Sequence, residues 1–138
     1  ADYAELVERA ITQSDNTAND RILRRVGGPA AVQDFLDTHG LSSIRFGTDE
    51  RSKQSAIAGL EWRQDYAQGP AFFEARDEVS PAVRRSAFEA YLADPLDGAP
   101  PVAVVGALAK LHRGELLSPG STSLLLGTLA RTRTPCLG

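Results

Sequence analysis

The sequence has few residues of several kinds that carry out chemistry in other proteins. Its 138 residues include one cysteine, Cys136, and two histidines, His39 and His112. A single cysteine excludes an internal disulfide bond, and two distant histidines argue against a zinc site. Only two of the 15 basic residues are lysines, Lys53 and Lys110. Any mechanism that needs a lysine therefore has two candidates.

The sequence also lacks a long hydrophobic run. The longest apolar passage, residues 102–111, is about half the roughly 18 residues that a membrane span requires. A net charge of −3 argues against nucleic acid or acidic lipid as a partner. A hydrophobic content of 42% is too high for a disordered chain. These values predict one soluble domain over residues 1–138, with no membrane span and no nucleic-acid partner.

Apolar spacing predicts helices through most of the chain. The strongest patterns occupy residues 3–11, 22–26, 29–39, 82–92, 102–113 and 119–129. The pattern weakens between residues 41 and 81, where we expect a short extended piece at 44–46 and a helix over 56–66. No strand pair, hairpin turn or βαβ alternation is evident. The predicted fold class is all-α.

Several common catalytic motifs do not occur in the sequence. It contains no glycine-rich phosphate loop, G-x-S-x-G elbow, H-E-x-x-H helix or C-x-x-C pair. Four aromatic residues, Trp62, Tyr66, Phe72 and Phe73, either line a ligand surface or pack a long loop onto the helices. The sequence leaves both interpretations open.

The tripeptide Ser14-Asp15-Asn16 is the remaining candidate for chemistry. All three residue types are preferred helix N-caps, so the tripeptide alone indicates only the start of a helix. Two further segments of the sequence bear on its interpretation. A Gly-Gly-Pro turn follows at residues 27–29, and the stretch Leu108-Ala-Lys-Leu-His-Arg-Gly-Glu-Leu-Leu-Ser118 lies further along.

These segments together resemble the class A serine β-lactamases and their penicillin-binding relatives. The resemblance spans residues 2–57 and 94–131, and residues 97–101 resemble the end of the family's Ω-loop. It implies the helical subdomain of a β-lactamase-like (α and α/β) serine hydrolase, with the sheet portion absent. Residues 58–93 are then an insertion in the Ω-loop region.

The resemblance assigns a role to each residue of the tripeptide. Ser14 corresponds to the serine whose hydroxyl passes a proton to the β-lactam nitrogen, because a hydroxyl both accepts and donates. Asp15 corresponds to a structural aspartate that ties the loop to neighbouring backbone groups. Asn16 corresponds to the asparagine that holds the substrate's acyl-amide carbonyl.

The Ω-loop supplies the family's deacylating glutamate. Counting forward from Gly40 places Glu50 at this position, where a carboxylate activates water against the acyl-enzyme. Counting back from Asp97, the structural aspartate that closes the loop, reaches Arg84, which cannot act as a base. The forward count is preferred because Arg45 and Ala56 flank it as in the family.

Three departures from the family pattern predict weak hydrolysis or an altered substrate preference. Thr48 replaces the arginine that pairs with the loop-closing aspartate, so Asp97 is expected to lose its usual partner. Gln54 and Asp20 replace two asparagines. Asp20 is expected to repel Glu50 if both are charged and close.

The sequence lacks both motifs that complete the family's active site. Neither lysine has a serine three residues earlier, so S-x-x-K is missing, and there is no K-T-G. We therefore expect the isolated chain to be inactive and to need the remainder of the enzyme as a partner. The resemblance implies a β-lactam or peptidoglycan-like small molecule as ligand, no cofactor, and a periplasmic or secreted bacterial location.

Two alternatives and one physical consequence accompany this interpretation. The chain could be a non-catalytic helical binding domain of the same fold, or a fragment of a penicillin-binding peptidase that does not need Glu50. In either case, helices that normally pack on a sheet would expose apolar surface, which predicts self-association.

Overall fold

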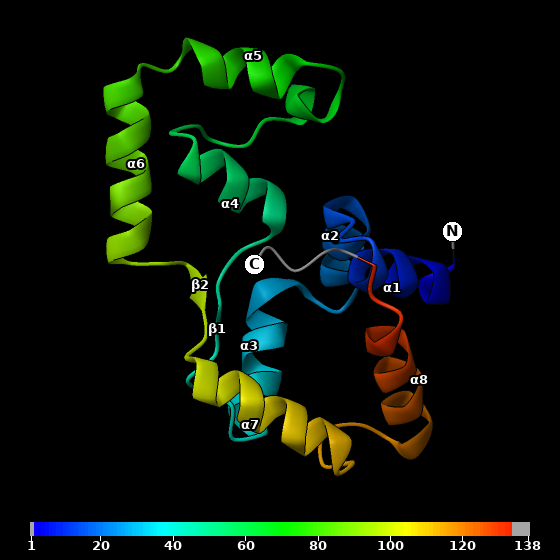
Figure 1. The fold of residues 1–138 in the computed structure, drawn as a ribbon. Coiled ribbons are helices and arrows are strands. Elements are labelled where there is room, and N and C mark those ends of the chain that lie inside the picture. The colour runs from blue at the N-terminus through cyan, green and yellow to red at the C-terminus, as the bar shows by residue number, and fades with distance from the viewer. Residues whose placement is uncertain (1, 134–138) are drawn as a thin grey trace.

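A computed structural model describes residues 2–133 and confirms the all-α class. Within these residues the chain forms eight α-helices, one 3₁₀ helix and two strands of two residues each (Figure 1). In chain order they are α1 (Tyr3–Thr12), α2 (Asn16–Arg25), α3 (Gly28–Thr38), β1 (Arg45–Phe46), α4 (Glu50–Ile57), η1 (Gln64–Ala67), α5 (Ala71–Glu78), α6 (Pro81–Ala93), β2 (Asp97–Gly98), α7 (Pro101–His112) and α8 (Pro119–Ala130).

Side-chain caps fix where most of the helices begin. Asp2, Asp15 and Asp49 each accept a hydrogen bond from a backbone N–H in the first turn of α1, α2 and α4. Ser80 and Ser118 cap α6 and α8, and a proline follows each serine at the first helical position. These are the residue types that satisfy unpaired N–H groups at a helix start.

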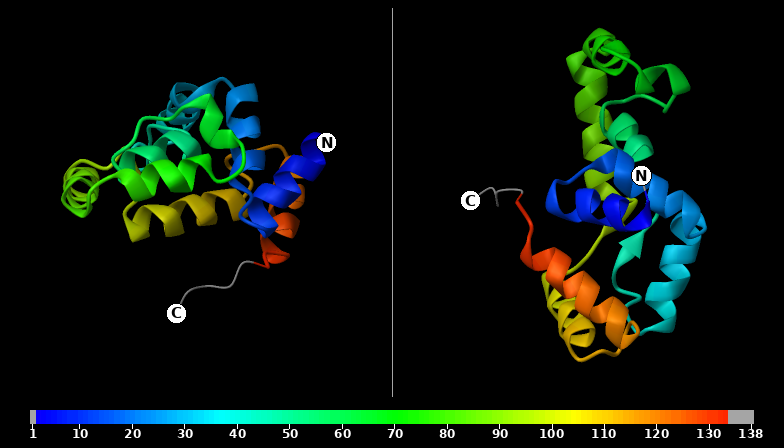
Figure 2. Two further views of the ribbon diagram at one scale, coloured as in Figure 1. Left: turned by 90° about the horizontal axis from the view of Figure 1, so that it is seen from above. Right: turned by 90° about the vertical axis from the view of Figure 1, so that its right-hand side faces the viewer.

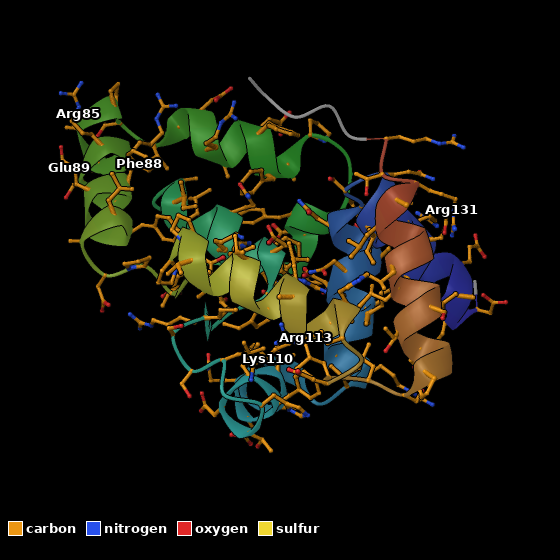
Figure 3. The ribbon with its side chains drawn as sticks, turned by 60° about the horizontal axis from the view of Figure 1, so that its bottom comes forward. Arg85, Phe88, Glu89, Lys110, Arg113 and Arg131 are labelled. Carbon is orange, nitrogen blue, oxygen red and sulfur yellow. The ribbon has the colours of Figure 1, made fainter. Side chains whose placement is uncertain are left out.

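The helices form two groups. Helices α1, α2, α3, α7 and α8 lie together, and α4, α5 and α6 form a lobe beyond the β1–β2 pair (Figures 1 and 2). The two ends of the described chain meet: Arg131, the residue directly after α8, forms an ion pair of 2.6 Å with Glu8 on α1 (Figure 3 shows Arg131). The Lys110 ammonium on α7 donates to the backbone carbonyl of His39 at the end of α3, at 2.8 Å.

The structure corrects the prediction between residues 41 and 81. The helix expected over 56–66 is wrong, because α4 starts at Glu50 under the Asp49 cap and ends at Ile57. Gly59 follows with a φ of +79°, a left-handed conformation that does not continue a helix. Helix α5 was not predicted, and neither was the antiparallel β1–β2 pair, in which Phe46 is opposite Asp97. Two-residue strands are too short to show alternation.

The hydrophobic core is small for eight helices. The described side chains that form it are Leu6, Ala18, Leu23, Leu41, Ala58 and Leu111. On α7 Leu111 is buried, while Val105 is 66% exposed and Leu108 50% exposed. On α8, Leu124 is 59% exposed. The expected exposed apolar surface is therefore present, and self-association stays a prediction. No described helix is long and apolar enough to cross a membrane.

Candidate functional site

The turn between α1 and α2 carries the tripeptide Ser14-Asp15-Asn16. Ser14 has a φ of +53°, the one positive φ among the described non-glycine residues. A serine in the left-handed region is strained, and such strain often occurs at functional sites. Ser14 and Asn16 are exposed, whereas Asp15 is half-buried. The turn thus presents a hydroxyl and an amide on either side of a fixed carboxylate.

Asp15 holds this turn in place. Its Oδ1 accepts a hydrogen bond from the backbone N–H of Ala18 at 2.9 Å, and its Oδ2 accepts one from Arg9 Nε on α1 at 2.9 Å. The bond from the Ala18 N–H lowers the pKa of Asp15; burial opposes this, and the Arg9 guanidinium adds to the lowering. This carboxylate therefore joins α1 to the start of α2.

Asp20 connects α2 to α4. The side chain is buried, and its Oδ1 accepts from the Glu50 N–H at 2.9 Å. Its Oδ2 accepts from the Arg51 N–H at 3.2 Å and from Arg51 Nε at 3.4 Å. Asp20 thus contacts the backbone of Glu50, and the expected repulsion between the two side chains stays a prediction. The carboxylate points at the N-terminal N–H groups of α4, where the helix dipole favours a negative charge.

A pocket of about 420 Å³ lies where α2 and α4 meet. Asn16 and Glu50 both line it. The residues that surround them are Thr17, Asp20, Arg51, Gln54, Ser55, Trp62, Tyr66, Ala67, Gly69, Phe72 and Phe73. The volume is within the range of about 300–1,000 Å³ that small-molecule sites occupy. Ser14, Asp15 and Asp97 are not among the lining residues.

The Lys53 ammonium binds two carboxylates beside this pocket. Its Nζ lies 2.6 Å from Glu50 Oε1 and 2.9 Å from Asp97 Oδ2. Tyr91 on α6 donates its hydroxyl to Asp97 Oδ1 at 2.6 Å. The partners of Asp97 are therefore Lys53 and Tyr91, and Thr48 is not one of them. This connection also ties α6 to β2.

The pKa values of the three groups reflect this contact. Burial acts to raise the pKa of Asp97, but the hydrogen bonds from Tyr91 and Lys53 outweigh it and leave the pKa below its usual value. Burial likewise acts to lower the pKa of Lys53, but hydrogen bonds to Glu50 and Asp97 raise it overall. The hydrogen bond to Asp97 raises the pKa of the Tyr91 phenol. All three shifts favour the ion-paired arrangement at neutral pH.

One side of the pocket is aromatic. Trp62, Tyr66, Phe72 and Phe73 form a chain of edge-to-face ring contacts, with successive ring centroids 6.0, 5.8 and 5.7 Å apart. We call these four residues the aromatic wall. The Arg51 guanidinium stacks on Trp62 with its carbon 5.1 Å from the ring centroid. Sequence analysis singled out the four residues but gave no signal that they face Glu50.

Residues 2–136 match the sequence profile of the beta-lactamase enzyme family. The chain belongs to this family. A comparison with curated proteins gave no match. The resemblance seen in the sequence thus holds at the level of the family of β-lactamase-type hydrolases, and the helical architecture is that of the family's helical subdomain.

The remaining candidates lie away from the pocket of this beta-lactamase family member. His39 Nδ1 lies 2.7 Å from the Phe35 carbonyl at the end of α3, and His112 is exposed on α7. Arg84, which the backward count reached, lies on α6 and does not line the pocket. Cys136 lies outside the described residues. Among residues 2–133, no group of three or more His, Cys, Asp or Glu side chains could hold a metal ion.

Replacing Lys53 with methionine is expected to destabilise the chain by about 1–2 kcal/mol. The change leaves two half-buried carboxylates without their shared cation, and partial exposure reduces the cost below that of a fully buried pair. Because the pKa of Asp97 is lowered in the folded state, the contribution is present above the unfolded pKa and is lost as pH falls through the folded value.

Urea unfolding at several pH values measures this effect. The difference between wild type and Lys53→Met should be largest at neutral pH and should shrink as the solution becomes acidic. Lys53→Arg is the matched control. It retains the positive charge and should therefore lose less stability than Lys53→Met. A pH-independent difference, or one that grows in acid, would contradict the ion-pair explanation.

Proposed function

We propose that this chain is the helical part of a class A β-lactamase-like serine hydrolase that opens β-lactam rings through an acyl-enzyme. The observation that supports this most strongly is the shared pocket: Asn16 on α2 and Glu50 on α4 line the same cavity. Asp20 on α2 accepts hydrogen bonds from the start of α4 and so holds the two helices side by side. An amide and a carboxylate facing one cavity suit the recognition of an acyl amide and the activation of water.

Each residue then has a role that its surroundings support. The Asn16 side-chain amide binds the acyl-amide carbonyl of the substrate. Lys53 occupies Oε1 of Glu50, so Oε2 is the oxygen that takes a proton from the attacking water. Ser14 passes a proton to the β-lactam nitrogen from the strained turn that Asp15 holds. Asp97 keeps the loop closed through Lys53 and Tyr91.

The nucleophile in this proposal is a serine outside the 138 residues. Residues 50 and 107, three positions before the two lysines, are glutamate and alanine, so the chain offers no S-x-x-K. We call the assembly of this chain with the polypeptide that carries S-x-x-K and K-T-G the complete enzyme. Isolated, the chain is expected to be inactive. The family supports a periplasmic or secreted location for the complete enzyme.

Intact-mass spectrometry before and after exposure to benzylpenicillin tests the proposal. The 138-residue chain alone should gain no mass, whereas the polypeptide that carries S-x-x-K should gain one opened β-lactam. In the complete enzyme, Asn16→Ala should slow acylation about 10- to 100-fold, because it leaves the substrate carbonyl without its donor. Asn19→Ala, on the same helix but outside the pocket lining, is the control and should acylate at the wild-type rate. Absence of any adduct in the complete enzyme would contradict the proposal.

The aromatic wall favours a second candidate, a non-catalytic helical domain that binds a cell-wall-like ligand. The same measurement separates the two, since this domain binds without forming an adduct. The predicted self-association, which the exposed face of α7 and α8 supports, is checked by sedimentation velocity.

A further inference from the structure

We propose that a second pocket, between α1 and α2, binds a small phosphate monoester whose phosphate is carried on an aromatic or other apolar group. The two helices lie side by side (Figure 1). The pocket has a volume of about 550 Å³ and is lined by Asp2, Tyr3, Leu6, Arg21, Arg24 and Arg25. None of these residues lines the pocket that Asn16 and Glu50 share, so the proposal does not depend on the proposed function.

The three arginines of this pocket have no acidic partner among residues 2–133. Arg21, Arg24 and Arg25 are three and four positions apart, so α2 presents them on one face. None of their guanidiniums forms an ion pair with a described residue. Most other arginines of the described chain do pair with a carboxylate: Arg9, Arg45, Arg51, Arg63, Arg76, Arg113 and Arg131. The pocket thus gathers positive charge that no described side chain neutralises.

The stability of α2 does not explain this cluster. Arg24 and Arg25 lie in the last turn, where the helix dipole favours cations, but Arg21 lies one turn earlier. Like charges four residues apart destabilise a helix, and Arg21 and Arg25 have this spacing. Asp2 also lines the pocket, but its Oδ1 caps α1 by accepting from the Glu5 N–H at 2.8 Å. A bound anion would offset the repulsion among the three guanidiniums.

The charges and donors of the lining fit a phosphate monoester. Three guanidiniums and the Asp2 carboxylate supply three positive charges and one negative charge, a net charge of +2. A phosphate monoester carries about −1.5 to −2 at neutral pH and offers three acceptor oxygens. Each guanidinium can donate two parallel N–H bonds to phosphate oxygens. A carboxylate has one charge and two oxygens, and so matches fewer of these donors.

Tyr3 and Leu6 supply the apolar part of the lining. Tyr3 is 48% exposed, and the Arg25 guanidinium stacks on its ring with the carbon 5.6 Å from the centroid. Leu6 is buried and belongs to the core. The stacked pair places phosphate donors beside ring surface that a ligand can cover. The net charge of −3 for the whole chain favours a small soluble ligand over an anionic membrane surface.

An NMR titration of the 138-residue chain tests the proposal. The Nε–H groups of Arg21, Arg24 and Arg25 give ¹H–¹⁵N cross-peaks that report on the pocket directly. Three probes are titrated: phenyl phosphate, inorganic phosphate, which has no ring, and benzoate, which joins the ring to a carboxylate. We expect phenyl phosphate to shift these peaks, and each of the other two probes to bind at least about 3-fold more weakly.

Variants locate the binding site. Arg24→Met should weaken phenyl phosphate binding about 3- to 10-fold, because it removes one guanidinium and keeps the length of the side chain. Arg24→Lys should lose less affinity than Arg24→Met, since lysine retains the charge but not the parallel pair of donors. Arg85→Met is the matched control. Arg85 is exposed on α6 outside this pocket, and its replacement should leave binding unchanged (Figure 3).

Four results would overturn the proposal. Equal binding of phenyl phosphate and benzoate would show that a single negative charge suffices, and equal losses in Arg24→Met and Arg85→Met would place the effect outside the pocket. Inorganic phosphate that binds as tightly as phenyl phosphate would leave the apolar part of the lining without a role. Phosphatidic acid carries the same phosphate monoester on a lipid. Sedimentation of the chain with phosphatidylcholine vesicles that contain phosphatidic acid, without a response to phenyl phosphate, would assign the arginines to a membrane surface instead.

Discussion

In the complete enzyme, Glu50→Gln is expected to slow deacylation about 100- to 10,000-fold and to trap the acyl-enzyme. Glutamine keeps the size of the side chain but cannot take a proton from water. The Glu50 N–H still donates to Asp20, so α4 keeps its start. Lys53 loses one of its two carboxylate partners but retains Asp97. The substitution therefore removes the base with little disturbance of the pocket.

A time course of intact mass after a pulse of benzylpenicillin measures this result. The wild-type adduct should decay, and the Glu50→Gln adduct should persist. Glu89→Gln is the control, because Glu89 lies on α6 outside the pocket, and its adduct should decay at the wild-type rate (Figure 3). A penicillin-binding peptidase does not need this glutamate. Persistence of the wild-type adduct, unchanged by Glu50→Gln, would therefore identify the protein as a peptidase and contradict the β-lactamase mechanism.

The sequence was most informative where capping residues and apolar periodicity agree. Asp15, Ser80 and Ser118 each precede a helix whose apolar positions recur at helical spacing, and each caps it in the structure. Such signals are local, because the cap hydrogen bond joins residues three apart. Helix α4 has a polar sequence and one such cap, Asp49, so the periodic pattern alone pointed to the wrong segment.

The contacts at the site depend on pairings between distant residues, which the sequence does not show. The aspartate at position 20 suggested repulsion of Glu50, because the sequence shows the charge of a side chain but not the way it points. In the folded chain this carboxylate also accepts hydrogen bonds from two backbone N–H groups, which the sequence does not indicate. Nothing in the sequence indicates that Lys53 contacts Asp97, since the two residues meet only when β2 returns beside β1. The roles of Ser14, Asn16 and Glu50 stay predictions, and the pocket that Asn16 and Glu50 share is the observation that supports testing them.

Asp20→Ala is expected to lower the free energy of unfolding of the 138-residue chain by about 2–3 kcal/mol. The substitution removes an acceptor that is 3% exposed and that binds two backbone N–H groups and the Arg51 side chain. Hydrogen bonds to a charged group contribute about 1.5–3 kcal/mol, and part of this is recovered if solvent reaches the freed N–H groups of Glu50 and Arg51, two residues that line the pocket. Asp20→Asn keeps the shape of the side chain and one carbonyl acceptor, so its free energy of unfolding should fall by about half as much as that of Asp20→Ala.

Chemical denaturation monitored by circular dichroism gives these values, with Asp34→Ala as the control. Asp34 is exposed in the middle of α3, and its replacement should change stability by no more than about 0.5 kcal/mol. An Asp20→Ala variant as stable as this control would show that the carboxylate does not join α2 to α4. The consequence would extend to the site, because Asn16 and Glu50 face one pocket only while the two helices keep this relation. A destabilised Asp20→Ala chain that also binds benzylpenicillin more weakly than Asp34→Ala would connect the buried carboxylate to the function.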